Sequence, residues 1–94
     1  DIYSLGCVAY ECLTGVPPFQ GEVMSSVLLR HLNESPQRPS KLNAALAPFD
    51  DIILRMLAKD PLNRPTLDQI TQALNPAAQE VQQELQRHKE IVVK

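Results

Sequence analysis

The sequence predicts a mainly α fold of about four to five helices with no sheet. Three observations carry this prediction. Apolar residues recur at helical spacing in the longer segments, Gly and Pro punctuate the chain between them, and no segment reads as a convincing strand. The 94 residues, 44% hydrophobic and 21% charged, are enough for one small domain with the composition of a soluble globular protein.

The first helix is predicted over Asp1–Thr14, with Asp1 as its N-cap and Gly15 just after its end. Its apolar residues cover the whole circumference, and a helix of this kind is expected to be buried on all sides. Pro17 and Pro18 then impose an extended exit, because proline disfavours helix for the residue before it.

A second helix is predicted over Glu22–Leu32, on the surface, with one apolar stripe formed by Met24, Val27, Leu28 and Leu32. The polar stretch Asn33–Leu46 follows, with Pro36 and Pro39, and is predicted to be a long surface loop.

A third helix is predicted to begin near Pro48, which suits a first-turn position. Its apolar residues follow the i, i+3, i+4, i+7, i+8 pattern: Phe49, Ile52, Ile53, Met56 and Leu57. Asp60-Pro61 ends this segment.

Thr66 and Gln69 fit a capping box that opens a fourth helix, which is predicted to end at Leu74. Asn75-Pro76 is interpreted as a fresh cap, with a fifth, Gln- and charge-rich helix over residues 76–94. Apolar spacing in that helix resembles a coiled-coil seam, but it is too short for one, so a helix packed on the domain or a linker is favoured over a dimer. The seam residues are Ala78, Val81, Leu85, His88 and Val92.

The net charge, the lack of a long apolar run and the cysteine spacing weigh against several functional classes and kinds of site. The net charge of −2 offers no basic face for nucleic acid or anionic lipid, and no apolar run approaches the ~18 residues of a membrane span. Cys7 and Cys12 lie about 140° apart on one predicted helix, so they cannot bridge each other, and they have no metal-ligand spacing. Buried thiols in a reducing compartment are expected. His31 and His88 are isolated and are expected on the surface.

Two blocks carry a family resemblance: DIYSLGCVAYECLTGVPPF at Asp1–Phe19 and LAKDPLNRPT at Leu57–Thr66. Together they resemble the helical C-terminal lobe of eukaryotic-type (Hanks-type) Ser/Thr protein kinases, most like the bacterial branch. The resemblance implies that residues 1–75 are the C-terminal part of a kinase catalytic domain and that residues 76–94 are a helical tail or linker. It also implies a parent enzyme that transfers the ATP γ-phosphate to Ser/Thr hydroxyls of protein substrates.

The motifs that handle phosphate in this family are not found here: the Gly-rich loop, the strand Lys, the H-R-D catalytic loop and the D-F-G metal site. The segment is therefore expected to contain no catalytic residue and no metal ligand, to bind neither ATP nor Mg²⁺ by itself, and to be inactive alone. The parent is expected in the cytoplasm, or anchored to a membrane with its kinase domain on the cytoplasmic side.

The resemblance assigns roles in the parent to five residues. Asp1 matches the Asp that supports the catalytic loop, and otherwise it is a plain N-cap. Arg64 matches the Arg that pairs with the Glu of the A-P-E motif in the activation segment, and otherwise it is a solvated Arg. Glu11 matches a position that recognises a basic substrate residue in some members, or is a polar point on a buried helix. Val8 and Cys12 match positions that support the hydrophobic surface under the adenine site. The alternative is that they are two ordinary core residues at i and i+4 with no ligand above them.

Two alternatives stay open. In a pseudokinase the same lobe would act as a docking scaffold, and only the H-R-D and D-F-G segments distinguish the two. An unrelated helical binding module, such as a helix-turn-helix protein, is the alternative from another class, and the acidic charge balance weighs against DNA binding.

Overall fold

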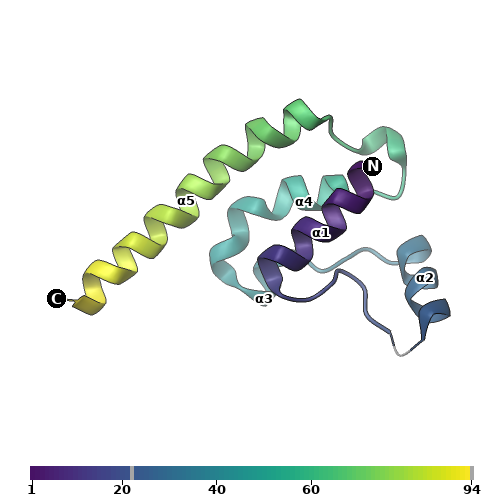
Figure 1. Ribbon diagram of the computed structural model, residues 1–94, viewed down its shortest axis with the longest axis horizontal. Helices are drawn as coiled ribbons and strands as arrows, with labels where there is room; N and C mark the ends of the chain where they lie inside the picture. The colour runs from purple at the N-terminus through teal and green to yellow at the C-terminus, as the bar shows by residue number, and fades with distance from the viewer. Residues whose placement is uncertain (22, 94) are drawn as a thin grey trace.

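The computed structural model describes the backbone of residues 1–21 and 23–93 and the side chains of residues 1–21 and 23–87. Within that part the chain is helical and contains no strand, which confirms the mainly α prediction (Figure 1). The elements are α1 (Ile2–Thr14), α2 (Met24–Asn33), α3 (Pro39–Leu42), the 3-10 helix η1 (Ala44–Phe49), α4 (Asp50–Met56), the 3-10 helix η2 (Pro61–Asn63) and α5 (Leu67–Val93).

The core forms around α4. The apolar stripe predicted for this segment is buried throughout, and Ile53 is fully enclosed at 0% exposure. Helix α1 packs on α4, while α3 and α5 pack on η1 (Figure 1). Burying each large aliphatic side chain of this stripe is worth about 1.5–3 kcal/mol, so these few residues supply much of the stability of the fold.

Helix α1 begins and ends as its sequence predicts. The Asp1 carboxylate accepts a hydrogen bond from the Tyr3 amide at 2.9 Å, and Gly15 adopts the left-handed conformation with φ 84°. The expectation of burial on all sides is not met in this chain. Of the residues of α1, Gly6 and Tyr10 are buried, while Val8 is 59% exposed and Cys12 is exposed. One face packs on α4 and the opposite face lies open.

The long loop predicted over Asn33–Leu46 was wrong in part. It contains α3 and the start of η1, because Asn43 caps η1 by accepting from the Ala45 amide at 3.0 Å and Asp50 accepts from the Ser40 amide at 3.0 Å. Pro48 lies inside η1 rather than in the first turn of an α-helix. These turns are too short to leave a periodic pattern in the sequence.

The predicted break at Asn75-Pro76 was also wrong. One continuous helix, α5, runs through Pro76. Its N-terminus forms the predicted capping box, in which Gln69 N donates to Thr66 Oγ1 at 3.2 Å and Thr66 N donates to Gln69 Oε1 at 2.9 Å. The helix continues past the proline because Ala77 and Val81 extend the face that packs on the core.

The seam proposed for the tail is only partly supported. Ala77 is buried, whereas its neighbour Ala78 is exposed, and Val81 is half-buried against the core while Leu85 is exposed. The remaining seam residues, His88 and Val92, lie outside the residues whose side chains are described. The packing of α5 on η1 agrees with the prediction of a helix packed on the domain.

Helix α2 lies at the edge of the molecule, far from the C-terminal end of α5 (Figure 1). It begins at Met24, and the predicted start at Glu22 lies outside the described residues. None of its residues is buried, and three of the four residues of its predicted apolar stripe are exposed: Met24, Leu28 and Leu32. The fourth, Val27, faces the body together with His31.

Among the described residues, no helix combines the length and the apolar character needed to cross a membrane.

Candidate functional site

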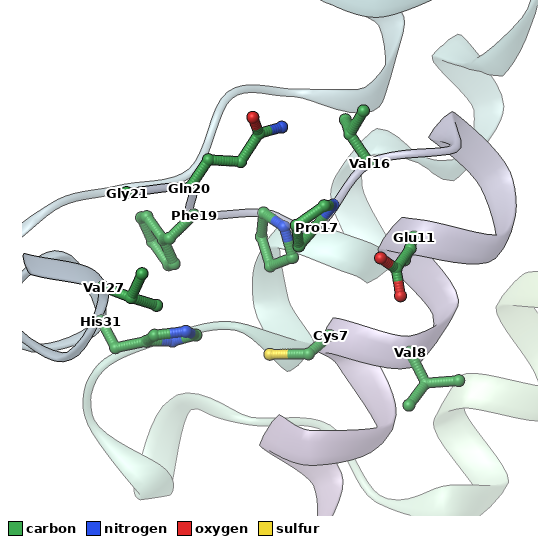
Figure 2. A pocket seen from close by; sticks show the side chains of 11 residues that line it. Cys7, Val8, Glu11, Val16, Pro17, Phe19, Gln20, Gly21, Val27 and His31 are labelled. Atoms are coloured by element: carbon green, nitrogen blue, oxygen red, sulfur yellow. The ribbon is translucent and has the colours of Figure 1, made fainter. Parts of the chain in front are cut away.

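A groove of about 690 Å³ runs along the open face of α1 (Figure 2). Its floor comes from α1, one wall from the extended segment that follows α1, and the far end from α2. The lining residues are Cys7, Val8, Glu11, Val16, Pro17, Pro18, Phe19, Gln20, Gly21, Val27 and His31. Most of these side chains are apolar, so the groove has a largely hydrophobic surface with a few polar groups at its edge.

The wall of the groove is held in place by local chemistry at the end of α1. Gly15 reverses the chain, and the Thr14 hydroxyl donates to the Tyr10 carbonyl at 2.8 Å and accepts from the Val16 amide at 3.2 Å. Pro17 and Pro18 then hold the backbone extended. The segment ends in Phe19, which is 5% exposed and anchors the wall to the body of the molecule.

Glu11 is the groove residue, among those described, that carries a negative charge, and its side chain is exposed beside Pro17 (Figure 2). It does not form an ion pair with any described residue, and it is not on a buried face of α1. A carboxylate at the edge of an apolar groove can attract a Lys or Arg side chain of a ligand that lies along it.

Val8 lies one turn from Glu11 and lines the same groove, whereas Cys12 is exposed and does not. Neither cysteine is buried, which corrects that expectation: Cys7 is half-buried, and both are free thiols. Cys7 points across the groove toward His31 (Figure 2). Burial raises the pKa of the Cys7 thiol, and the nearby Lys59 ammonium offsets this only in part.

His31 was predicted to be a surface histidine, and it lies at a half-buried position where α2 meets the rest of the molecule. Its Nδ1 lies 2.6 Å from Tyr3 Oη, and its ring packs edge-on against the ring of Phe19 at 4.7 Å between centroids. Burial, with a smaller contribution from Lys59, lowers the pKa of His31 below its ordinary value of 6.5. The sequence signal was the spacing of His31 four residues after Val27, which belonged to the predicted apolar stripe of this helix.

Arg64 lies at the opposite end of α1 from Glu11. Its Nε donates to the Ala58 carbonyl at 2.9 Å, a second guanidinium nitrogen lies 3.3 Å from the Lys59 carbonyl, and the guanidinium stacks over the Tyr3 ring at 4.9 Å. The side chain is half-buried, so it is not the solvated Arg of the alternative interpretation. It also lines a smaller cavity of about 260 Å³, together with Tyr3, His31, Leu32 and Lys59.

The predicted site residues are therefore spread along α1 and around its N-terminal end. Val8 and Glu11 share the groove, while Asp1 caps α1 and accepts a second hydrogen bond from Ser4 Oγ at 3.3 Å. No three His, Cys, Asp or Glu side chains gather as metal ligands in the described part of the chain.

A model of the protein kinase domain matches residues 1–75. The chain belongs to the protein kinase domain family. It is 51% identical over 65 residues to serine/threonine-protein kinase PknB of Mycobacterium tuberculosis, 49% identical over 65 residues to PknB of Mycolicibacterium smegmatis, and 48% identical over 65 residues to PknE of M. tuberculosis. The resemblance to bacterial Ser/Thr kinases is thus confirmed.

Each of these alignments covers 68% of this kinase-domain chain but 10–11% of the relative. The chain therefore spans about a tenth of the length of the curated relatives it matches.

Proposed function

We propose that the protein containing this chain is a Ser/Thr protein kinase that transfers the γ-phosphate of ATP to hydroxyl groups of protein substrates. The observation that carries the proposal is the identity of about half of the aligned residues to Ser/Thr kinases, within a kinase-domain match over residues 1–75. ATP and Mg²⁺ bind to other parts of the protein in this proposal. Residues 1–75 belong to the catalytic domain, and residues 76–94 form a helical tail or linker.

The role we propose for this segment is a helical platform. Asp1, at the start of α1, supports the catalytic loop, and Val8 with Cys12 supports the hydrophobic surface beneath the adenine. The exposure of Val8 and Cys12 on the open face of α1 favours this role, because that face can pack against another part of the domain. A cytoplasmic location is proposed on the grounds that both cysteines are free thiols.

Glu11 is proposed to bind a basic residue of the substrate. Its exposure at the edge of an apolar groove supports this, because a peptide lying along the wall of the groove would place a cationic side chain near the carboxylate and apolar side chains against Val16 and Pro17.

Arg64 is proposed to pair with a glutamate of the activation segment. A guanidinium has five N–H donors, and the contacts with the Ala58 and Lys59 carbonyls occupy two of its nitrogens while they fix its orientation. No Asp or Glu among the described residues lies within ion-pair distance of Arg64. The remaining donors suit a bidentate carboxylate, which Lys could not bind in the same geometry.

The experiment compares the intact protein with its Arg64→Ala and Arg64→Lys variants, in assays of protein phosphorylation and of nucleotide binding. Breaking a buried pair from one side costs ~3–5 kcal/mol, against ~1 kcal/mol or less for a surface pair. We expect Arg64→Ala to lower phosphorylation far more than nucleotide affinity, and Arg64→Lys to restore it only partly. Arg55→Ala is the control, since Arg55 is exposed and its Asp51 partner lies at 3.9 Å.

Two outcomes of these assays test the catalytic proposal and the Arg64 ion pair separately. Intact wild-type protein that binds nucleotide but transfers no phosphate would favour a pseudokinase scaffold and overturn the catalytic proposal. Near-normal turnover and stability in Arg64→Ala would overturn the ion pair alone. The 94-residue chain, incubated with labelled ATP and Mg²⁺, is expected to give no transfer above a protein-free blank.

A further inference from the structure

Helix α2 is joined to the rest of the molecule by very few side chains. None of its residues is buried, and the leucines that an amphipathic surface helix would use for packing are exposed, with Leu28 at 58%. Hydrophobic burial therefore contributes little to holding α2 in place. Its position depends on the contacts made by its two inward side chains, Val27 and His31, and by its C-terminal end.

His31 makes the central contact. Tyr3 Oη of α1 lies 2.6 Å from its Nδ1, and the ring is packed edge-on between Phe19, at 4.7 Å, and Tyr3, at 5.7 Å between centroids. In the neutral imidazole Nδ1 is able to accept the phenolic proton. The phenol then has an acceptor, and the histidine ring fills the space between two aromatic rings.

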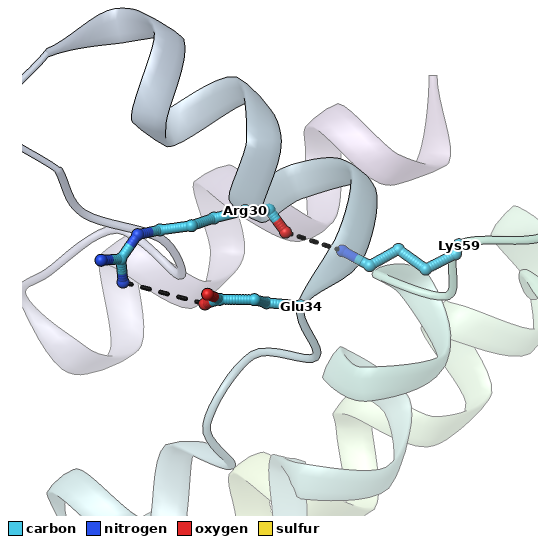
Figure 3. A network of polar contacts seen from close by, with 3 residues as sticks. All are labelled: Arg30, Glu34 and Lys59. Carbon is cyan, nitrogen blue, oxygen red and sulfur yellow. Dashed lines mark hydrogen bonds and ion pairs between the residues drawn. The ribbon is translucent and has the colours of Figure 1, made fainter.

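Lys59 makes the second contact. It follows α4, and its ammonium donates to the His31 carbonyl. The ammonium also approaches the Arg30 carbonyl at 3.5 Å, as Figure 3 shows. These carbonyls belong to the last turn of α2, where a cation is favoured by the helix dipole. Lys59 also lies over the Phe19 ring at 4.5 Å from its centroid. One cation thus connects α4, α2 and the wall of the groove.

The charges around His31 disfavour its protonation. From α1 it faces the neutral phenol of Tyr3 and the thiol of Cys7, and from beyond α4 it faces Lys59 and, across Tyr3, Arg64. On its own helix the nearby charges are Arg30 and Glu34, which pair with each other at 3.8 Å (Figure 3). No described carboxylate forms an ion pair with His31.

We propose that Tyr3, His31 and Lys59 form a pH-sensitive latch that docks α2 against α1 while His31 is neutral and releases α2 when His31 takes up a proton. A protonated Nδ1 no longer accepts from Tyr3, and the two groups can then bond only with the phenol oxygen as the acceptor. The new charge also lies close to the Lys59 ammonium, which packs on the same Phe19 ring, and repulsion between the two cations weakens the docked state. The inference rests on the geometry of these three residues and does not depend on the proposed kinase activity.

The direction of the pH dependence follows from linkage. A histidine whose pKa is lowered in the docked state stabilises that state fully above its ordinary pKa, and this stabilisation is lost as the pH falls through the lowered value. Each unit by which docking lowers the pKa makes the docking equilibrium about tenfold less favourable at low pH than at high pH. Docking is therefore most favourable above the ordinary pKa of histidine and weakens in mildly acidic solution.

The experiment is hydrogen–deuterium exchange on the intact protein between about pH 8 and about pH 5, with labelling times scaled to the intrinsic exchange rate at each pH. We expect amide protection of α2 to fall with pH while that of α4 is unchanged. His31→Gln keeps an acceptor and cannot be protonated, so α2 should stay protected throughout. His88→Gln is the matched control and should behave as wild type. Tyr3→Phe should lower the protection of α2 already at high pH.

Three results would overturn the latch: α2 protection that is independent of pH in the wild type, an unchanged pH dependence in His31→Gln, or equal loss of protection in α2 and α4. If His31→Gln does not fold, the test is an NMR titration of the His31 ring protons in ¹³C-histidine-labelled wild-type protein. Their titration midpoint should coincide with the midpoint for loss of α2 protection, and a midpoint that differs from it would contradict the proposal.

Discussion

At the scale of single residues, Gly6 decides how closely α1 approaches α4. A Cβ atom at this position would lie 2.9 Å from Met56 Cβ and 3.1 Å from Leu57 Cδ2. Both partners are buried in the core, and the nearest atom belongs to a Cβ that cannot move without its backbone. The role of this glycine is therefore to give space between two helices.

Gly6→Ala is expected to destabilise the intact protein, although alanine is the better helix former. Overpacking a well-filled core costs about 1–3 kcal/mol, which exceeds the ~1 kcal/mol that alanine gains over glycine in a helix. The measurement is the free energy of unfolding by urea. Gln72→Ala, at an exposed position of α5, is the control, since it introduces alanine into a helix without changing the core. An increase in stability for Gly6→Ala would show that α1 and α4 can separate freely.

At the scale of secondary-structure elements, α5 shows how packing overrides local sequence. Pro76 has no N–H to donate to the carbonyl of Gln72, and its ring disfavours a helical turn before it. The helix nevertheless continues, because Ala73 and Ala77 lie on either side of the proline and both face the core. The proline ring itself is exposed, so it displaces no packed side chain.

Pro76→Ala should therefore strengthen α5. Proline in a helix interior is about 3 kcal/mol less favourable than alanine, and the substitution restores a backbone hydrogen bond. The expected result is slower amide exchange in the turns on both sides of position 76 and a higher free energy of unfolding. Asn75→Ala, at the exposed neighbouring position, is the control and should give a much smaller gain. A loss of helix in Pro76→Ala would mean that the proline is needed in this turn.

At the scale of the whole molecule, the chain is flat, extending over 51 × 33 × 15 Å. Its accessible surface is 6702 Å². A compact monomer of this length exposes about 5,400 Å². The excess is partly apolar, since Val8 on α1 and Met24, Leu28 and Leu32 on α2 are all exposed. A thin molecule of this kind cannot bury a helix on all sides.

The 94-residue chain in isolation is accordingly expected to keep its helices without a fixed tertiary structure. Exposed apolar patches of this kind favour association, and weak packing gives the properties of a molten globule. Far-UV circular dichroism should show helix, while the dye ANS should bind strongly and heating should give a broad transition. A soluble monomer with a sharp cooperative transition and no dye binding would contradict this expectation.

The elements that the sequence predicts well are those with strong local signals. The cap at Asp1, the stop at Gly15, the stripe along α4 and the capping box at Thr66 all depend on neighbouring residues, so a short window of sequence contains the whole cause. The motifs at both ends of the matched region identified the kinase family for the same reason.

Other features depend on contacts between residues distant in sequence, and only the tertiary structure decides them. His31 is half-buried because Tyr3 and Phe19 contact it from elsewhere in the chain. The exposed side of α1 follows from which helices lie against it, since its sequence is apolar all round. Pro76 remains helical because the core beneath α5 outweighs a lost hydrogen bond. Burial is a property of the assembled helices, and the pattern along one helix sets only which faces are able to accept it.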